Sequence, residues 1–406
     1  MSTEQPHICL ASSCDCGMSR RDFLKLSALT SAALALPLLQ AGDVQAQQFS
    51  SDEMPVKIGY LPLTDATPLL VADALGMYEA EGLTCEKPRL FRSWAQIVEA
   101  FVSGQVNVIH LLAPATLWVR YGARFPAKVV AWNHTNGSAL TVANSVNSIS
   151  ELAGKTVSVP FWYSMHNILL QQLLRDNNLV PVTSGRVTTL ADNEVRIIVQ
   201  PPSEMVSALA SGAIAGFIVA DPFNAIAESK GIGKPLRFSG DMWKDHACCV
   251  TVLSERDIEQ RPEWAQKVTT ALVKAQLWVK DNPVQTAALL ANSAEQRYSP
   301  HDAEVLQRVF SQDDYLQYQN QLTHPQWQQR RIGFQPYPYP SYTEQLVRSL
   351  QGTQLEGNNA FLAKLEPSFV AEDLVDERFV RKALEEVGGL GAFGLPAAFS
   401  REEHIA

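Results

Sequence analysis

The clearest pattern in the chain is an arrangement of apolar and polar positions that occurs twice. Residues 98–114 read VEAFVSGQVNVIHLLAP, and residues 206–222 read VSALASGAIAGFIVADP. In each copy, apolar residues at helical spacing end at a glycine suited to a left-handed helix end, an apolar run follows, and a proline opens the next helix. We therefore predict an internal duplication of a helix followed by a buried strand.

A second pair of apolar runs opens each half of the duplication. Residues 57–62 (KIGYLP) precede a helical pattern that reaches about residue 81, and residues 155–160 (KTVSVP) precede one over 165–177. Strands that alternate with helices of this length indicate parallel sheets covered on both faces. Each half should therefore form a doubly wound α/β lobe.

Further apolar runs lie between and after the two halves. Residues 129–131 and 139–142 are interpreted as the first crossover between the lobes, and residues 248–253 as the strand that returns to the first lobe. Because ligands of open α/β sheets bind beyond the carboxyl ends of the strands, both lobes should face one cleft. The expected boundaries are 55–138 with 250–295 for lobe 1, 139–249 for lobe 2 with the crossovers, and 296–406 for a mostly helical C-terminal extension packing on lobe 1.

The first 46 residues have the layout of an export signal. Residues 19–25 read SRRDFLK, the twin-arginine pattern that sends folded proteins through the membrane, and the apolar stretch 26–39 follows. That stretch is too short to span a bilayer. We predict a twin-arginine signal peptide over residues 1–46, the twin-arginine translocase as a partner during export, and a periplasmic mature protein.

Composition and charge exclude several other classes of function. The formal net charge is -9 and basic residues are scattered, so we expect no nucleic-acid partner. The mature chain keeps Cys85, Cys248 and Cys249. Neighbouring cysteines form a bridge only in a strained ring, so we interpret this pair as free thiols. Hydrolase motifs such as GxSxG and HExxH are missing from the sequence, and we expect no catalytic residue, no metal and no cofactor.

Six short stretches resemble the solute-binding proteins of the nitrate, bicarbonate and sulfonate (taurine) ABC importer family, in the order and spacing of its nitrate and bicarbonate branch. They are Gly59–Ala66, Ser93–Trp94, Leu112–Pro114, Asn136–Ala139, Ala220–Asn224 and Trp243–His246. The resemblance implies a two-lobed type II periplasmic binding protein fold, no catalysis, and delivery of a small polar solute to an ABC permease and its ATPase. Two lobes joined by a hinge also favour a monomer.

Candidate ligand contacts lie at the predicted strand ends. Thr64 and Asp65 follow the first strand, where they could equally cap the next helix. The Trp94 ring could stack on a planar ligand, or it could simply pack in the core. The other candidates are Asn136 in a matching stretch, Trp162, Tyr163 and His166 between a strand and a helix, Gln200 at a strand end, Asp221 before Pro222, and Cys249 on the returning strand. His166 could instead be structural, and Asp221 could be a helix cap.

The identity of the solute depends on Cys249. Nitrate binders that resemble this chain carry a lysine at the aligned position, and loss of that charge weakens anion binding. A planar cation or amide such as guanidinium or urea is therefore the alternative, although a shifted alignment would make Lys244 the missing cation. Calcium beside Asp65 or Asp221 also remains open. Two other functions use this fold, an enzyme similar to the thiamine-pyrimidine synthases, suggested by His246–Cys249, and a sensory domain docked to a receptor kinase.

Overall fold

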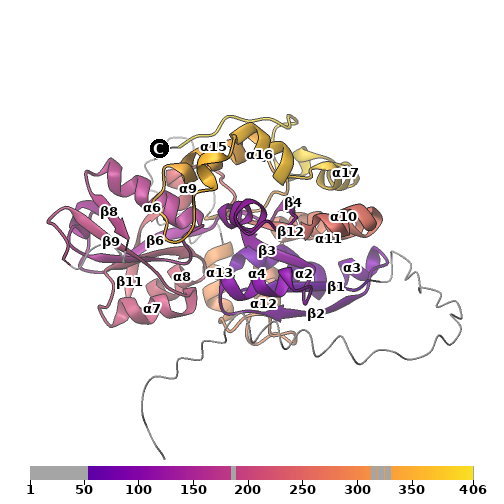
Figure 1. The fold of residues 1–406 in the computed structure, drawn as a ribbon. Helices are drawn as coiled ribbons and strands as arrows, with labels where there is room; N and C mark the ends of the chain where they lie inside the picture. Colours follow the sequence, from indigo (N-terminus) through magenta and orange to yellow (C-terminus); the bar gives the residue numbers. More distant parts are fainter. Residues whose placement is uncertain (1–53, 184–188, 312–317, 319–323, 325–330, 406) are drawn as a thin grey trace, which may run out of the picture. The chain divides into compact units, whose positions relative to one another are not determined.

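The computed structural model describes residues 54–183, 189–311, 318, 324 and 331–405, and the predicted signal peptide lies outside them. The described residues form one unit of tertiary contacts, built on two large sheets (Figure 1). Within the described ranges, no helix is both long and apolar enough to cross a bilayer.

The first lobe is the five-stranded sheet with its helices, in the strand order β2-β1-β3-β12-β4. Strand β1 runs parallel to β2 and β3, whereas β12 runs antiparallel to β3 and β4. The strands are β1 (Val56–Tyr60), β2 (Cys85–Leu90), β3 (Val108–Leu112), β4 (Ala127–Trp132) and β12 (Cys249–Ser254). The helical segments between β1 and β4 are η1 (Thr64–Ala66), α2 (Thr67–Ala74), α3 (Met77–Ala80), α4 (Trp94–Val102), α5 (Ala113–Leu117) and η2 (Trp118–Gly122).

The second lobe is built on a six-stranded sheet in the order β11-β6-β10-β7-β9-β8. Its strands are β6 (Ser138–Ala143), β7 (Thr156–Val159), β8 (Val180–Thr183), β9 (Glu194–Val199), β10 (Gly216–Ala220) and β11 (Gly233–Phe238). Figure 1 shows α6 (Met165–Asp176) on one side of this sheet and α7 (Pro202–Ala210) with α8 (Phe223–Ser229) on the other. The short segment η3 (Ile149–Leu152) precedes β7. Helices on both faces agree with the predicted doubly wound arrangement.

The predicted duplication is present in the structure. In the first copy α4 leads into β3, and in the second α7 leads into β10. The two helices are followed by Gly104 and Gly212, whose φ angles of 75° and 73° lie in the left-handed region that favours glycine. The repeated sequence pattern therefore specified both the strand and the turn that precedes it.

Two crossovers join the lobes. The chain leaves the first sheet at β4 and enters the second at β6 through β5 (Thr135–Asn136), and it returns from β11 to β12 through α9 (Ser239–Met242). Strand β5 pairs with β13 (Ile332–Gly333), so a segment from the C-terminal third also reaches the crossover region.

The chain beyond β12 is mostly helical and contacts both lobes. The described helical segments are α10 (Glu255–Gln260), α11 (Pro262–Asp281), α12 (Pro283–Leu290), α13 (Ala303–Phe310), α15 (Pro340–Gln351), η5 (Leu362–Lys364), α16 (Pro367–Leu374), α17 (Arg378–Glu386) and η6 (Leu390–Phe393). Val375 forms a bridge with Val129 of the first lobe. The Gln354 backbone N–H donates to the Gln171 side chain of α6 in the second lobe at 2.9 Å. The C-terminal extension is expected to pack on the first lobe, and the structure adds these contacts with the second.

Candidate functional site

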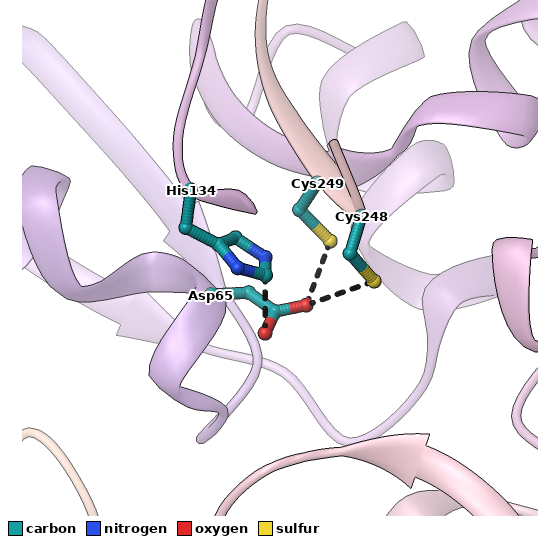
Figure 2. A group of neighbouring side chains, drawn as sticks. All are labelled: Asp65, His134, Cys248 and Cys249. Carbon is teal, nitrogen blue, oxygen red and sulfur yellow. Dashed lines mark hydrogen bonds and ion pairs between the residues drawn. The ribbon is translucent and has the colours of Figure 1, made fainter. Parts of the chain in front are cut away.

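The candidate site is a buried group of four side chains, Asp65, His134, Cys248 and Cys249 (Figure 2). One candidate ligand atom from each residue lies within 4.8 Å of all the others. Asp65 lies in η1, directly after β1, and His134 lies between β4 and β5. Cys248 precedes β12 and Cys249 is its first residue. The group therefore combines a strand end of the first lobe with both crossovers.

Asn133 holds these three segments together. Its backbone N–H donates to the Cys249 carbonyl at 3.1 Å, and its side-chain amide donates to the Asp65 carbonyl at 3.2 Å. The Asn133 side-chain oxygen accepts a hydrogen bond from the Thr251 hydroxyl. All of these groups are buried, so an enclosed hydrogen-bond network holds the backbone at Asp65 and Cys249 in place.

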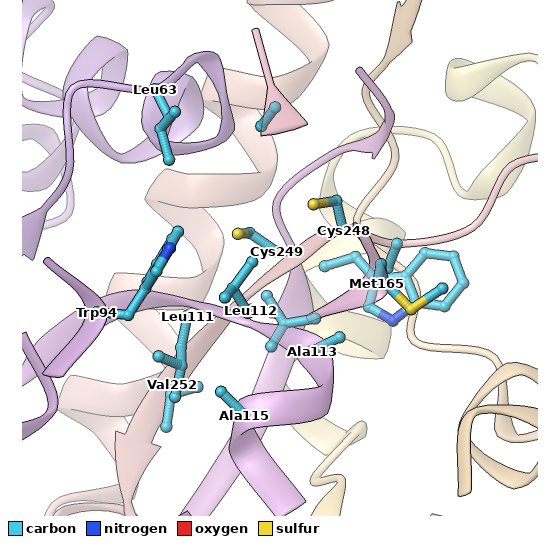
Figure 3. Close-up of a cluster of buried hydrophobic side chains, with 14 of the residues drawn as sticks. Leu63, Trp94, Leu111, Leu112, Ala113, Ala115, Met165, Cys248, Cys249 and Val252 are labelled. Atoms are coloured by element: carbon cyan, nitrogen blue, oxygen red, sulfur yellow. The ribbon is translucent and has the colours of Figure 1, made fainter. Parts of the chain in front are cut away.

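The Asp65 carboxylate is the centre of the group. The Cys249 thiol donates to Asp65 Oδ2 at 3.0 Å, and the Cys248 sulfur lies 3.7 Å from the same oxygen. His134 Nε2 approaches Asp65 Oδ1 to 3.2 Å. Both thiols also belong to an apolar cluster that includes Trp94, and Figure 3 shows them among these side chains.

Burial and close contact shift the ionisation of this group. Burial raises the pKa of the Asp65 carboxyl, although the His134 imidazole acts in the opposite direction. Burial lowers the pKa of His134, but the Asp65 carboxylate outweighs it and raises the pKa to about 10. Burial and the contact with Cys248 raise the pKa of the Cys249 thiol. Burial also opposes ionisation of Cys248, yet hydrogen bonding with Cys249 and the imidazoles of His166 and His134 bring its pKa well below the ordinary value. Cys248 is therefore the thiol that ionises first.

Two residues of the second lobe cover the group. His166 is near the start of α6 and Ser138 is the first residue of β6. His166 Nε2 lies 3.7 Å from the Cys248 sulfur and 2.9 Å from the Ser138 hydroxyl. The lobes also meet where the Thr64 hydroxyl donates to the Asp221 carbonyl at 3.0 Å.

Two further polar groups beside the site are buried without hydrogen-bond partners among the described residues. His110 Nε2 accepts a hydrogen bond from the Leu61 amide at 2.8 Å, so its Nδ1 carries the proton. Burial lowers the pKa of His110 to about 3, which keeps the ring neutral. The Trp94 ring lies 5.2 Å from the His110 ring, and neither Trp94 Nε1 nor His110 Nδ1 has a partner in the described ranges.

The structure brings together some of the sequence-predicted residues. Asp65 and Cys249 are in direct contact, His166 lies beside Cys248, and Trp94 packs on His110. Thr64 links the lobes as described above. For all the predicted residues, a role in binding a ligand stays a prediction.

Asp221 has a partner that the sequence did not indicate. Arg331 donates to both Asp221 carboxylate oxygens, at 2.6 Å and 2.8 Å, and both side chains are fully buried. A charge-assisted bidentate pair of this kind occupies the carboxylate. The Asp221 carboxylate is thus already paired in this structure, and its role as a ligand contact stays a prediction.

The remaining predicted residues lie elsewhere. The Tyr163 hydroxyl donates to the Asn358 carbonyl at 3.4 Å, and its ring stacks on Phe361. Trp162 and Gln200 are partly exposed. The Asn136 amide donates to Asp245 at 3.2 Å.

A cavity of about 600 Å³ lies against the first crossover and the C-terminal segment. Asn136, Lys244 and Asp245 line it, together with Lys280 and residues from the range 393–404. Lys244, the alternative cation for an anionic solute, is thus at this cavity and is not one of the four clustered residues.

Sequence reasoning missed His134 and Cys248. Successive side chains of a strand point to opposite faces, so two neighbouring cysteines are not expected to converge on one carboxylate. They converge here because Cys248 lies just before β12 begins. The sequence signal for His134 is weak, since it is a single histidine between two predicted crossover strands.

Comparisons with known proteins agree with this architecture. Residues 50–293 match the model of the NMT1-like family, and residues 17–37 match the twin-arginine translocation pathway signal sequence. The second match confirms the predicted export signal and the periplasmic location of the protein.

Individual relatives give the same result. The chain is 25% identical over 280 residues to the nitrate/nitrite binding protein NrtA of a Nostoc species, a match that covers 64% of this chain. The match covers 61% of that relative, so the chain spans less than two thirds of its length. The name of this relative supports the resemblance found in the sequence.

Two solved structures show the same fold. The periplasmic nitrate-binding protein NrtA from Synechocystis aligns with a TM-score of 0.68 at 19% identity, over 86% of this chain and 93% of the other. A zinc-bound ligand-binding component of an ABC-type import system from Staphylococcus aureus aligns with a TM-score of 0.63 at 20% identity, over 82% and 99%. They confirm the predicted two-lobed periplasmic binding protein fold.

Proposed function

Because the chain belongs to the NMT1-like family, we propose that it is the solute-binding component of an ABC importer. In this role it captures a small solute between its two lobes in the periplasm and passes it to a permease that works with an ATPase. The export signal, the two-lobed fold and the names of the relatives support the proposal.

The observation that carries the proposal is the buried polar group between the lobes. Asp65, His134 and the two thiols come from the first lobe and the crossovers, and His166 comes from the second lobe. Polar atoms buried without a partner cost about 1–3 kcal/mol each. Trp94 Nε1, His110 Nδ1 and His166 Nδ1 are of this kind among the described residues. A solute that pairs with such atoms would hold the lobes together.

The charge of the site favours a cationic or neutral solute. In the described part of the chain, the hydrogen bonds and ion pairs of the Asp65 carboxylate involve His134, Cys248 and Cys249 but no lysine or arginine. His134 is paired with Asp65, so an anionic solute beside this carboxylate would need a further cation, because a buried anion without a cationic partner is strongly disfavoured. We therefore place a cation or neutral solute ahead of the nitrate, bicarbonate and sulfonate class.

A small oxyanion is the second candidate. The N–H groups Trp94 Nε1 and His110 Nδ1 are buried next to one another and have no acceptor in the described ranges. Two such donors could hold the oxygen atoms of nitrate or bicarbonate.

A thermal-shift screen of the purified mature protein tests the proposal. The solutes are nitrate, nitrite, bicarbonate, taurine, urea, guanidinium and divalent metal ions. A bound solute at about 100 times its Kd adds about 2.7 kcal/mol of stability. We expect this gain in the wild type and its loss in Asp65→Asn.

The matched control is Asp245→Asn, because Asp245 lines the separate cavity. A stabilising solute whose effect disappears in Asp245→Asn and persists in Asp65→Asn would contradict the placement of the solute between the lobes. The importer role itself is then tested by measuring uptake of the solute identified in the screen by cells with and without this protein.

A further inference from the structure

We propose that Asp65, His134, Cys248 and Cys249 bind a divalent metal ion of the zinc class, and that this ion is the solute captured between the lobes. The inference that the ion is the captured solute rests on the proposed function, whereas metal binding by the isolated protein does not.

The donor set is the first argument. The group offers one carboxylate oxygen, one imidazole nitrogen and two sulfur atoms, all buried. Zinc prefers four ligands of these types in tetrahedral geometry. Calcium and magnesium prefer oxygen ligands only, so the two thiols select against them.

The spacing of the donor atoms is the second argument. The four candidate ligand atoms lie within 4.8 Å of one another. Zinc bonds of about 2.0–2.3 Å place tetrahedral ligand atoms roughly 3.3–3.8 Å apart. Small side-chain movements of about 1 Å are therefore enough to close the group around an ion.

The hydrogen bonding of His134 and Asp65 is the third argument for a metal ion. Neither ring nitrogen of His134 forms a hydrogen bond of good geometry in the described part of the chain, although Nε2 lies 3.2 Å from Asp65 Oδ1. The Asp65 oxygen in that contact likewise has no hydrogen-bond partner there. A metal ion between these two atoms would replace their poorly aligned contact by two coordination bonds.

The origin of the ligands explains how an ion could be captured and released. All four ligands belong to the first lobe or the crossovers, whereas His166 and Ser138 belong to the second lobe. The ion would bind to a site already assembled on the first lobe, and closure would bring His166 over it. Asn133 braces the Asp65 and Cys249 backbones, so the site stays assembled when the lobes separate.

The thiols also suit the export route. Free thiols are prone to oxidation in the periplasm. Cys248 and Cys249 are free and fully buried, and the twin-arginine signal sends the protein across the membrane already folded. The two ligands are thus enclosed before they reach the oxidising compartment.

Cobalt binding to the purified, reduced mature protein tests the site. Co²⁺ replaces Zn²⁺ in tetrahedral thiolate sites and produces a sulfur-to-cobalt charge-transfer band. We expect one equivalent of Co²⁺ with this band, its displacement by Zn²⁺, and a loss of zinc affinity of about 100-fold or more by calorimetry in Cys248→Ser and Cys249→Ser.

Cys85→Ser is the matched control, because Cys85 is the third cysteine of the mature chain and lies outside the group. Its band and affinity should equal those of the wild type. Lack of a charge-transfer band, or an equal loss in Cys85→Ser, overturns the metal site. If circular dichroism shows that a serine variant does not fold, Asp65→Asn provides the same comparison with both thiols in place.

Zinc uptake by cells tests whether the ion is the transported solute. We expect accumulation of labelled zinc to fall in cells that produce Cys249→Ser and to stay normal with Cys85→Ser. Unchanged uptake with Cys249→Ser would overturn the inference that the ion is the solute.

The two proposals can fail separately. If no metal binds but another solute in the thermal-shift screen stabilises the wild type and not Asp65→Asn, the metal proposal fails and the proposed function stands. If zinc binds but cells lacking the chain import every tested solute normally, the proposed function fails while the metal site stands.

Discussion

At the scale of single residues, the environment of each carboxylate decides what it is available for. Asp65 and Asp221 both follow a strand, and both are completely buried. Asp221 is held by two hydrogen bonds from Arg331, whereas Asp65 faces an imidazole and two thiols. One carboxylate is therefore paired with a buried arginine, whereas the other is surrounded by groups that can bind a metal ion.

The Asp221–Arg331 pair leads to a stability prediction. Arg331→Met should lower the free energy of unfolding by about 3–5 kcal/mol, because it leaves the buried Asp221 carboxylate without its cation. Urea denaturation followed by circular dichroism measures the change.

The double variant Asp221→Asn/Arg331→Met should recover part of the loss, since no buried charge remains. A double variant that is less stable than Arg331→Met alone would contradict this account. Arg348→Met is the control, because the Arg348 side chain is 52% exposed and pairs with Glu344 at the surface.

At the scale of elements, an ionic cluster attaches the C-terminal helix α16 to the first lobe. Arg120 of η2 donates to both carboxylate oxygens of Asp373 in α16, at 2.6 Å and 2.8 Å. Arg120 also pairs with Glu255 at 3.2 Å, and Lys128 of β4 donates to the Asp373 carbonyl. Three separate parts of the chain therefore meet at one guanidinium group.

This cluster predicts an acid-sensitive contribution to stability. The hydrogen bonds from Arg120 lower the pKa of Asp373 to about 2, below the value near 3.9 of an unfolded aspartate. The stabilisation is therefore complete above about pH 4 and is lost as the pH falls from 4 towards 2. The Tm of Asp373→Asn should therefore fall less over this pH range than the Tm of the wild type.

Thermal melts between pH 2 and 6 measure this difference. Asp281→Asn is the control, because the Asp281 side chain is 60% exposed and pairs with its neighbour Lys280. A pH profile of Asp373→Asn that follows the wild type would show that the cluster does not contribute.

At the scale of the whole molecule, the two crossovers make relative movement of the lobes the expected response to a solute. The lobes touch through the Thr64 and Asp221 contact and through His166 and Cys248. The chain crosses between the two sheets twice, through β5 and through α9, which is the arrangement of a hinge.

Small-angle scattering of the mature protein tests this movement. We expect the radius of gyration to fall when the solute identified by the thermal-shift screen is added at saturation, because the solute bridges the lobes. His166→Ala should reduce the change, since His166 of the second lobe contacts Cys248. Identical wild-type profiles with and without solute would contradict closure.

The sequence by itself determined the export signal and the two-lobed α/β architecture. The reason is physical, because alternation of apolar runs, helix-ending glycines and prolines is local information, and each copy of the duplication carries it in full. Gly104 and Gly212 illustrate this, since their left-handed turns follow from sequence position alone.

The partners of the buried charged groups were decided only by the tertiary structure. Arg331 reaches Asp221 across 110 positions, and Cys249 reaches Asp65 across 184. Single-residue patterns contain no signal for such distances. The convergence of Cys248 and Cys249 depends on where β12 begins, and the position of His134 depends on a crossover that exists only when both sheets are formed. The sequence therefore indicated the region of the site, while its chemistry emerged from contacts between segments that are far apart in the chain.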